Sequence, residues 1–298
     1  MKKTFIFSSA VVVFFILHGE LIAQEFLMKY KFPNGSEWKF KKYETTVAHI
    51  AGPGGLEQNI DRKTEALLKI RGLSRDDRIA SYLFIQDTIF IDEAKNETMG
   101  FRISDLFNRI TNKRIQVDLF PNGNLKNISM LDPIIPAANA PLMLSDSILS
   151  QQALLFPTLP DKSIRIGESW TDARSDTASP KIGVAGMGTT DGLTIRHQST
   201  SYTVSGKEKM LGFNCIKLTW KSTIKSESQM TIGETEMYTE EDANAVGTLY
   251  FAIAEGIIVS MELKQYSDNT TAMYSGNENT TLPSSTTSET KLILIPTP

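Results

Sequence analysis

Apolar and polar residues alternate along most of the chain with a period of two, not with the 3.6-residue period of a helix. The clearest examples are the runs Phe26 to Phe32, Ile115 to Leu119 and Ile216 to Trp220. A strand with one buried and one solvated face has this pattern, because successive side chains point to opposite faces. The pattern therefore predicts a mostly β protein built from antiparallel sheet.

Turn signals separate these runs. Gly35 and Gly123 each follow an asparagine between two strand-like segments, and Asn-Gly is favoured in tight hairpin turns. The glycine-rich residues 183–188 and the Ser/Thr-rich residues 277–290 are predicted to be loops. A last strand is expected after the second loop.

One segment has helical spacing. Between Pro141 and Pro157, apolar residues recur three and four positions apart. Proline is tolerated in the first turn of a helix, and a second proline would end it. This segment is predicted to be an apolar helix that connects two parts of the chain.

Two landmarks recur at nearly the same spacing in these two parts. Residues 35–38 (Gly-Ser-Glu-Trp) resemble residues 167–170 (Gly-Glu-Ser-Trp), and the strand before Gly123 resembles the strand before Gly256. The recurrence predicts a tandem repeat, with two similar antiparallel, curved, half-barrel-like halves joined by the helix. Whether the halves fold as one domain or two stays open. The predicted division is a signal peptide at 1–23, an N-terminal β half at 24–135, a connecting helix at 136–158 and a C-terminal β half at 159–298.

The first 23 residues are typical of a secretory signal peptide. Lys2 and Lys3 precede a short apolar core, and the small residue Ala23 stands at the expected cleavage site. The core is shorter than the ~20 apolar residues that a membrane helix needs. No later segment is apolar enough for a membrane span. We therefore expect a periplasmic or secreted protein that has no membrane span after cleavage.

Composition narrows the classes further. The formal net charge is −3, so the chain lacks the basic footprint that nucleic-acid binding requires. Cys215 is its single cysteine, which excludes an internal disulfide and leaves stability to packing. Because Cys215 lies in a strand-like run, we expect its thiol to be buried and unreactive.

Three turn and packing motifs lie between Asn112 and Met261: Asn-Gly at 122–123, Gly-Glu-Ser-Trp at 167–170, and Gly-Thr-Leu-Tyr-Phe at 247–251. They resemble the Gly-Asp-Ser-Trp and Gly-Thr-x-x-Phe elements of a family of exported bacterial proteins of unknown function, although this chain has Glu in place of the usual Asp. The resemblance implies a fold and a compartment, but no activity. The chain is also distantly similar to half-barrel lipoprotein carriers of the LolA and LppX type. That similarity implies a curved antiparallel sheet around a hydrophobic cavity closed by helices.

No catalytic or metal-binding motif stands out. His49 and His197 do not form an H-E-x-x-H pattern, and G-x-S-x-G is absent. The glycines of 183–192 lack the lysine of a phosphate-binding loop. The acidic run at 234–242 is more typical of a solvated hairpin tip than of a Ca²⁺ site. We therefore expect no enzyme activity, no cofactor and no metal, although carboxylate pairs that assemble only in space stay open.

The best remaining function is non-enzymatic binding of an apolar ligand, such as a lipid or acyl chain. The alternatives are a structural or interaction module that pairs an exposed strand edge with an envelope protein, and a hydrolase with a spatially assembled site. A closed core without a cavity is an equally good alternative to the apolar pocket. The predicted helix would form the lid of that pocket, with candidate residues Leu142, Met143, Leu144, Ile148, Leu149, Leu155 and Phe156.

Overall fold

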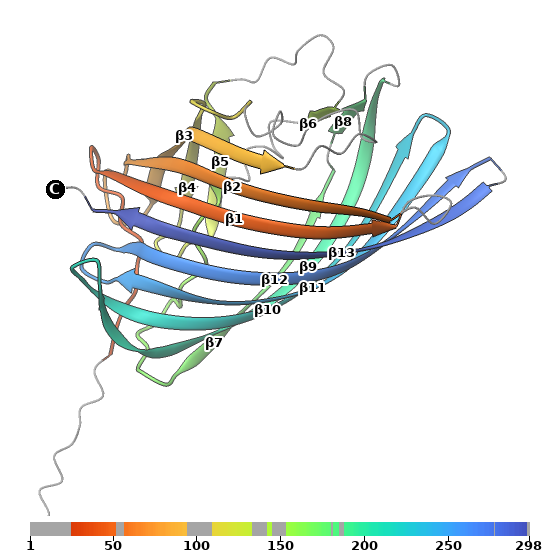
Figure 1. Ribbon diagram of the computed structural model, residues 1–298. Helices are drawn as coiled ribbons and strands as arrows, with labels where there is room; N and C mark the ends of the chain where they lie inside the picture. Colours follow the sequence, from red (N-terminus) through yellow and green to blue (C-terminus); the bar gives the residue numbers. More distant parts are fainter. Residues whose placement is uncertain are drawn as a thin grey trace, which may run out of the picture.

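Thirteen antiparallel strands make up the described part of the protein (Figure 1). The structure is a computed structural model, and it describes residues 25–51, 57–93, 109–132, 142–144, 153–179, 181–184, 188–276 and 278–296. The strands are β1 (Glu37–Ala51), β2 (Glu57–Gly72), β3 (Ala80–Glu93), β4 (Arg114–Leu119), β5 (Leu125–Met130), β6 (Leu142–Leu144), β7 (Ser169–Ala178), β8 (Lys181–Val184), β9 (Gly188–Met210), β10 (Phe213–Ile232), β11 (Thr235–Ala252), β12 (Ile257–Ser275) and β13 (Glu278–Ile295).

All of these strands belong to one continuous sheet in the order β5-β4-β3-β2-β1-β13-β12-β11-β10-β9-β8-β6, with β7 also paired to β9. β1 and β13 pair from Lys39↔Ile295 to Ile50↔Ser284, which joins the N-terminal strands to the C-terminal strands. The predicted fold of two halves joined by a helix is therefore wrong. Two separate halves would have left β1 and β13 as long edges with unpaired backbone groups, and their pairing removes both edges.

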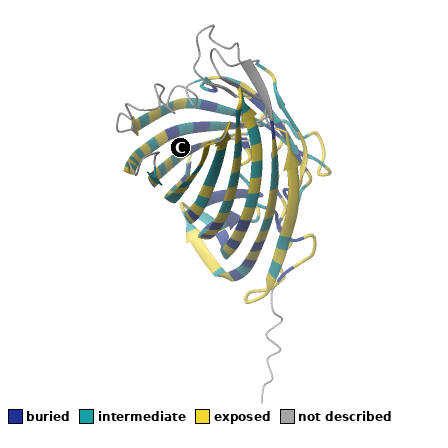
Figure 2. Ribbon diagram, turned by 90° about the vertical axis from the view of Figure 1, so that its right-hand side faces the viewer, coloured by how far each residue is buried: buried dark blue, intermediate teal, exposed yellow. Residues whose placement is uncertain are grey.

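The sheet curls across its strands, so that it has an inner and an outer face (Figure 1). Bands of buried and exposed residues alternate along most of the long strands, as the period of two in the sequence predicts (Figure 2). In β1, for example, Phe40, Thr46 and Ala48 are buried on the inner face, whereas Lys41 and Val47 are exposed on the outer face.

The helix predicted for residues 136–158 is also wrong wherever this segment is described. Its residues 142–144 form the short strand β6, which pairs with β8, and no α-helix is present from Ala153 to Phe156. Short apolar runs have similar spacing in helices and in buried extended segments, so spacing alone could not distinguish them. Residues 145–152 lie outside the described residues.

One end of the curled sheet is filled by the N-terminal segment Glu25–Phe32, which runs inside it in an extended conformation. Phe26, Met28, Tyr30 and Phe32 are 0–5% exposed and belong to the hydrophobic core. We call this end of the molecule the filled end. Other core residues there come from nearly every long strand: Phe40, Leu68, Ile70, Tyr82, Phe84, Val204, Leu218, Leu249, Phe251, Leu292 and Leu294.

Turns on opposite sides hold this segment through its backbone. The Phe26 and Ile164 backbones bond in both directions at 2.9 and 3.0 Å. The Tyr30 N–H donates to the Pro121 carbonyl at 2.8 Å, and the Lys31 N–H donates to the Gly256 carbonyl at 2.9 Å. These bonds satisfy backbone groups that would otherwise be buried without partners.

Further along the strands, the inner face becomes polar. Its buried positions there are mainly small and hydroxyl-bearing residues, namely Thr46, Thr200, Ser222, Ala243, Ala245 and Ser267. Beyond them the hairpins β10–β11 and β12–β13 extend as narrow ribbons, and we call this region the open end (Figure 1).

The loop predicted for residues 277–290 is wrong, because residues 278–290 belong to β13 and pair with both β12 and β1. Threonine is β-branched and suits a strand, and a strand that is solvated on both faces shows no apolar alternation. The glycine-rich loop is wrong in part, since residues 183–184 lie in β8 and residue 188 begins β9. Residues 185–187 lie outside the described residues.

No tandem repeat is evident among the strands that the structure describes. The landmarks that recur in the sequence are turn glycines, with φ of +81° at Gly35, +89° at Gly123, +86° at Gly167 and +68° at Gly256. Positive φ favours glycine, so similar turns select similar residues without duplication of a whole unit.

Candidate functional site

A groove of about 830 Å³ crosses the outer face of the sheet over β1, β13, β12, β11, β10 and β9. Because the strands twist, a curled sheet has the shape of a hyperboloid, which is narrowest at its waist. The outer surface is therefore hollowed at the waist. The groove follows such a waist. Its outward-facing residues are Tyr43, Thr45, Ser201, Thr203, Thr219, Lys221, Val246, Thr248, Glu262, Lys264, Glu289 and Lys291.

Strand register arranges these residues in two parallel rows. The first row is Tyr43–Lys291–Glu262–Thr248–Thr219–Thr203, and the second is Thr45–Glu289–Lys264–Val246–Lys221–Ser201. Directly opposed residues on neighbouring strands lie on the same face within side-chain contact distance. The two rows therefore form the walls, and the backbone between them forms the floor.

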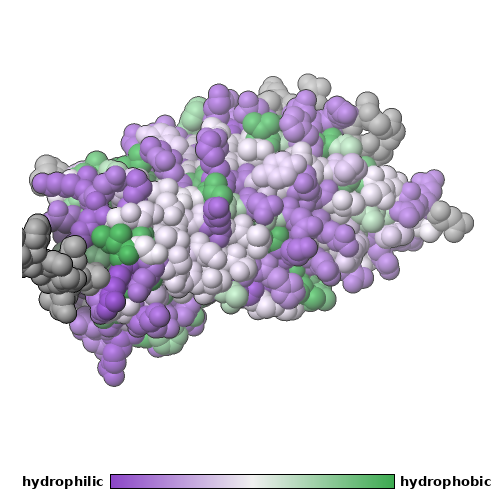
Figure 3. Space-filling model, turned by 90° about the horizontal axis from the view of Figure 1, so that it is seen from below, coloured by the Kyte–Doolittle hydropathy of each residue, from purple (hydrophilic) through white to green (hydrophobic). Residues whose placement is uncertain are grey.

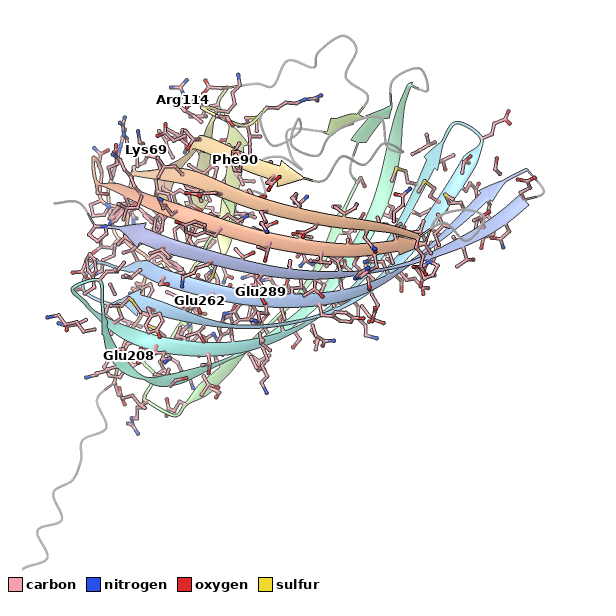
Figure 4. The ribbon with its side chains drawn as sticks, viewed as in Figure 1. Lys69, Phe90, Arg114, Glu208, Glu262 and Glu289 are labelled. Carbon is pink, nitrogen blue, oxygen red and sulfur yellow. The ribbon has the colours of Figure 1, made fainter. Side chains whose placement is uncertain are left out.

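The charged residues of the walls neutralise each other. Lys264 Nζ lies 2.6 Å from Glu289 Oε1, and Lys291 Nζ lies 2.6 Å from Glu262 Oε1. Glu262 and Glu289 lie near each other at the middle of the sheet (Figure 4). Both pairs are solvent-exposed, so each contributes at most about 1 kcal/mol to stability. Lys221 adds one further cation, and the groove is close to neutral.

Hydroxyl groups cover the opposite part of the groove. Thr219 bonds to Ser205 at 3.0 Å, Thr203 to Ser169 at 2.8 Å and Ser201 to Thr171 at 3.1 Å. A hydroxyl can donate and accept at once, so each can also take a ligand bond. The face seen from below carries mostly hydrophilic and neutral side chains, with apolar residues isolated from one another (Figure 3).

Beneath the floor, a row of aromatic rings lines the inner face. Trp170 stacks on Tyr202 with centroids 4.9 Å apart, and Tyr202 lies 6.4 Å from Trp220. Gly247 lies opposite Trp220, and a Cβ there would come within 2.5 Å of the indole ring. Burial, followed by the nearby Asp172 carboxylate, raises the pKa of Tyr202 to about 12. This row marks the boundary between the apolar core and the polar inner face.

A charged cluster lies on the inner face of β1 and β2. Glu44 accepts from Lys42 at 2.8 Å and from Arg62 at 3.2 Å. Burial favours a higher pKa for Glu44, but the two cations outweigh burial and lower the pKa below its usual value. Arg62 also donates to the Thr46 hydroxyl at 3.3 Å. The cluster is connected within itself and holds β1 against β2.

The residues predicted to form an apolar lid are only partly described. Ile148 and Leu149 lie outside the described residues, and Leu142, Met143 and Leu144 are described only as the backbone of β6. Leu155 and Phe156 pack against the core at the filled end. Phe156 lies among the rings of Tyr30, Phe32, Phe40 and Tyr82, at centroid distances of 5.2 to 6.5 Å.

The other candidate residues lie apart from one another. Cys215 is 2% exposed, and burial raises its pKa to about 11, so it is a thiol at neutral pH. His49 is exposed on the outer face of β1, with Nδ1 2.6 Å from Asn59 Oδ1, and His197 lies opposite Lys225. In the described ranges, no group of three His, Cys, Asp or Glu side chains is arranged to hold a metal ion.

The acidic run of residues 234–242 lies on the β10–β11 hairpin, from its turn into β11. Asp242 pairs with Lys225 at 3.3 Å, and Glu240 and Asp242 are exposed on the outer face. This placement is that of a solvated hairpin.

The groove was missed in the sequence because its residues had the pattern of ordinary solvated strand faces. Two spacings could have indicated it. Glu262 and Lys264 alternate on one strand, and Glu289 and Lys291 alternate on the next, so antiparallel pairing can place both opposite-charge pairs in register. Register was needed to bring them together.

No known protein family matches the chain, and no curated protein matches it. Across the described ranges, no helix has the length and apolar character needed to cross a membrane. The predicted kinship with a family of exported proteins is therefore not shown.

Solved structures that match the chain at low similarity include a neisserial surface protein, a Pseudomonas aeruginosa protein and a hypothetical lipoprotein. Neisserial surface protein A matches at 8% identity over 86% of this chain and 96% of that one, with a TM-score of 0.21. OpdQ of Pseudomonas aeruginosa matches at 7% identity over 87% and 99%, with a TM-score of 0.26. The hypothetical lipoprotein YmcC of Escherichia coli matches at 11% identity over 83% and 86%, with a TM-score of 0.23. Scores this low support no conclusion about fold or function.

Proposed function

We propose that the protein is an exported, non-enzymatic binding protein of the cell envelope, and that its outer groove holds a neutral, extended carbohydrate chain. The observation that supports this most directly is the groove itself. It crosses six neighbouring strands, which at ~4.8 Å per strand gives a length of about 24 Å. An open groove of this shape suits a short polymer better than a compact metabolite.

The chemistry of the walls selects the class of ligand. Hydroxyls from β9, β10 and β11 and the paired charges of β12 and β13 offer donors and acceptors along the whole length. Tyr43 and Val246 add apolar surface on which a sugar ring can lie. The compensated charges favour a neutral ligand over a polyanion. An acyl chain would displace water from both ion pairs. It could not supply hydrogen bonds in place of those that the pairs make to water, so its binding would be unfavourable.

The predicted apolar ligand stays a prediction, because part of its predicted lid lies outside the described residues. The apolar part of the inner face is packed against Phe26, Met28, Tyr30 and Phe32. No described contact favours a lipid, and the groove is the better-supported site.

Binding can be tested by calorimetry with the exported, purified protein and a panel of neutral oligosaccharides, acidic oligosaccharides and a short-chain phospholipid. We expect binding to neutral oligosaccharides of four or more sugars. Tyr43→Ala should weaken that binding at least tenfold. The control is Tyr274→Ala, which removes a tyrosine that is also exposed (46%, against 37% for Tyr43) but lies far along β12, and it should leave binding unchanged.

Two results would overturn the proposal. One is the lack of any binding to the neutral panel at millimolar concentration. The other is binding that responds equally to Tyr43→Ala and Tyr274→Ala, because it would then not use the groove.

A further inference from the structure

Strand β7 has one free edge in the described part of the molecule. It pairs with β9 from Ser169↔Thr203 to Ala178↔Thr194, and no other described strand contacts its far side. β8 pairs with the same edge of β9 as β7 does, and its own outer edge is paired with β6. The free edge is therefore limited to the ten residues of β7.

The direction of the backbone groups on this edge follows from two hydrogen bonds. The Val204 N–H donates to the Glu168 carbonyl at 3.0 Å, and the Val204 carbonyl accepts from the Gly167 N–H at 2.8 Å, so both backbone groups of Val204 face the β7 side. Hydrogen-bonded and non-hydrogen-bonded pairs alternate in an antiparallel ladder. The residues whose N–H and C=O groups point away from β9 are therefore Ser169, Thr171, Ala173, Ser175 and Thr177.

The inner face of β7 carries Trp170, Asp172, Arg174 and Asp176, and the charged residues at its centre have a definite order. Asp172 and Arg174 flank Ala173, and Arg174 Nε now lies 2.8 Å from Asp172 Oδ2. Inward-pointing charges on an edge strand normally prevent pairing with another strand. A partner must therefore place a cation opposite Asp172 and an anion opposite Arg174.

A second copy of β7 meets this condition. If two copies pair antiparallel about a two-fold axis at Ala173, Asp172 of each lies opposite Arg174 of the other. On the same face, Trp170 of each copy lies opposite Asp176 of the other, at the ends of the paired segment. The outer face pairs Thr171 with Ser175 and Ser169 with Thr177, all small neutral side chains. Alternative axes at Asp172 or Arg174 would oppose like residues.

We propose that the free edge of β7 is a self-association surface, and that two copies of the protein join there into one continuous antiparallel sheet. The proposal rests on the charge order and backbone direction of β7 and is independent of the groove ligand. In the dimer, the Ala173 pair is hydrogen-bonded, and each Asp172–Arg174 pair occupies the closer, non-hydrogen-bonded position.

Charge exchange gives the main test. The molar mass of the purified protein is measured by sedimentation over a range of concentrations for wild type, Arg174→Asp, and the double variant Asp172→Arg with Arg174→Asp. We expect a dimer for wild type and at least a tenfold weaker association for Arg174→Asp. The double variant should regain the dimer, because the swapped charges are again complementary about the same axis.

Cysteine cross-linking tests the register. In a hydrogen-bonded antiparallel pair the Cα atoms lie ~5.5 Å apart, within reach of a disulfide. Ala173→Cys should therefore form a cross-linked dimer under mild oxidation. Ser175→Cys, two residues away on the same face, should not, since it would lie opposite Thr171 of the second copy. The native Cys215 is buried and does not compete.

A wild-type monomer at all concentrations would overturn the proposal, whether or not the edge captures another protein. A dimer that is unaffected by Arg174→Asp, or that cross-links equally through Ala173→Cys and Ser175→Cys, would overturn it as well. Circular dichroism of each variant checks folding, because the Asp172 side chain is only 20% exposed and the Arg174 side chain 39% exposed.

Discussion

The filled end and the open end of the molecule are built from the same strands but are stabilised in different ways. At the filled end, inner residues such as Leu218, Leu249 and Phe251 pack around the N-terminal segment and are fully buried. At the open end, both faces of the β10–β11 and β12–β13 hairpins carry polar residues. Strand pairing is continuous across the boundary.

The comparison shows that β structure extends well beyond the hydrophobic core. The open end depends on backbone hydrogen bonds, cross-strand side-chain pairs and tight turns such as the one at Gly233. Two polar faces specify register only weakly, so the register of the open end is set by the filled end and by the turns. Equal changes at the two ends should therefore have unequal effects on stability.

The largest difference is expected for loss of an aromatic ring. Phe32 is fully buried and contacts the rings of Tyr30, Trp38 and Tyr82. Phe32→Ala should lower the free energy of unfolding by about 3–5 kcal/mol. Tyr274→Ala, which removes an exposed ring at the open end, should lower it by less than about 0.5 kcal/mol. Denaturant unfolding of both variants measures the difference, and similar losses would contradict the division into two ends.

Smaller but still marked effects are expected where turns contact the N-terminal segment. A Cβ at Gly123 would lie 2.7 Å from the Pro157 carbonyl oxygen and from the Tyr30 ring. Gly123→Ala should destabilise the protein by about 2–3 kcal/mol, from positive φ and from overpacking.

Gly212→Ala is the matched control for this prediction. Gly212 has the same φ of +89°, but a Cβ there would meet nothing within 4 Å. The control should lose only about 1 kcal/mol, from the left-handed conformation alone. If both variants lose the same amount in denaturant unfolding, the turn at Gly123 does not hold the N-terminal segment.

The strands of the filled end could largely be predicted from the sequence. Alternation in Phe26 to Phe32 and Ile216 to Trp220 indicated residues that are buried on one side only, and Asn-Gly marked the turns at Gly35 and Gly123. The open end could not be predicted in this way, because the Ser/Thr-rich residues 278–290 have no apolar alternation. These residues are polar because both faces of the strand are solvated. From composition alone, such a strand cannot be distinguished from a loop.

Contacts between distant segments were also beyond the sequence pattern. The pairing of β1 with β13 decides that the sheet is continuous, yet neither strand contains a signal for its partner. The groove arises from the same long-range register, which places Glu262 opposite Lys291. The apolar residues near Phe156 lie in a segment without helix and pack against the core. Apolar residues are favoured there because they are buried, and their spacing happened to match that of a helix.

At the boundary between the two ends, Glu44 should make stability depend on pH. Its pKa is lowered in the folded protein by Lys42 and Arg62, so its contribution is present above the unfolded value of about 4.3 and is lost as the pH falls through the folded value. Glu44→Gln should cost about 1–2 kcal/mol at pH 7. It should also reduce the fall in stability below about pH 4.3. Unfolding of Glu44→Gln and wild type at several pH values measures both effects.

The smallest effect is expected for the ion pairs on the outer face, which lie over both regions. Glu262 and Lys291 are 2.6 Å apart, but both are about half exposed, so water screens their attraction. A double-mutant cycle with Glu262→Ala and Lys291→Ala should give a coupling energy below about 1 kcal/mol, and 1 M salt should reduce it further. A coupling of several kcal/mol would instead mean that the walls of the groove help to hold the sheet together. A small coupling energy would mean that Glu262 and Lys291 can give up their mutual bond to bind a ligand at little cost in stability. The same variants could then be used to measure ligand binding without unfolding the protein.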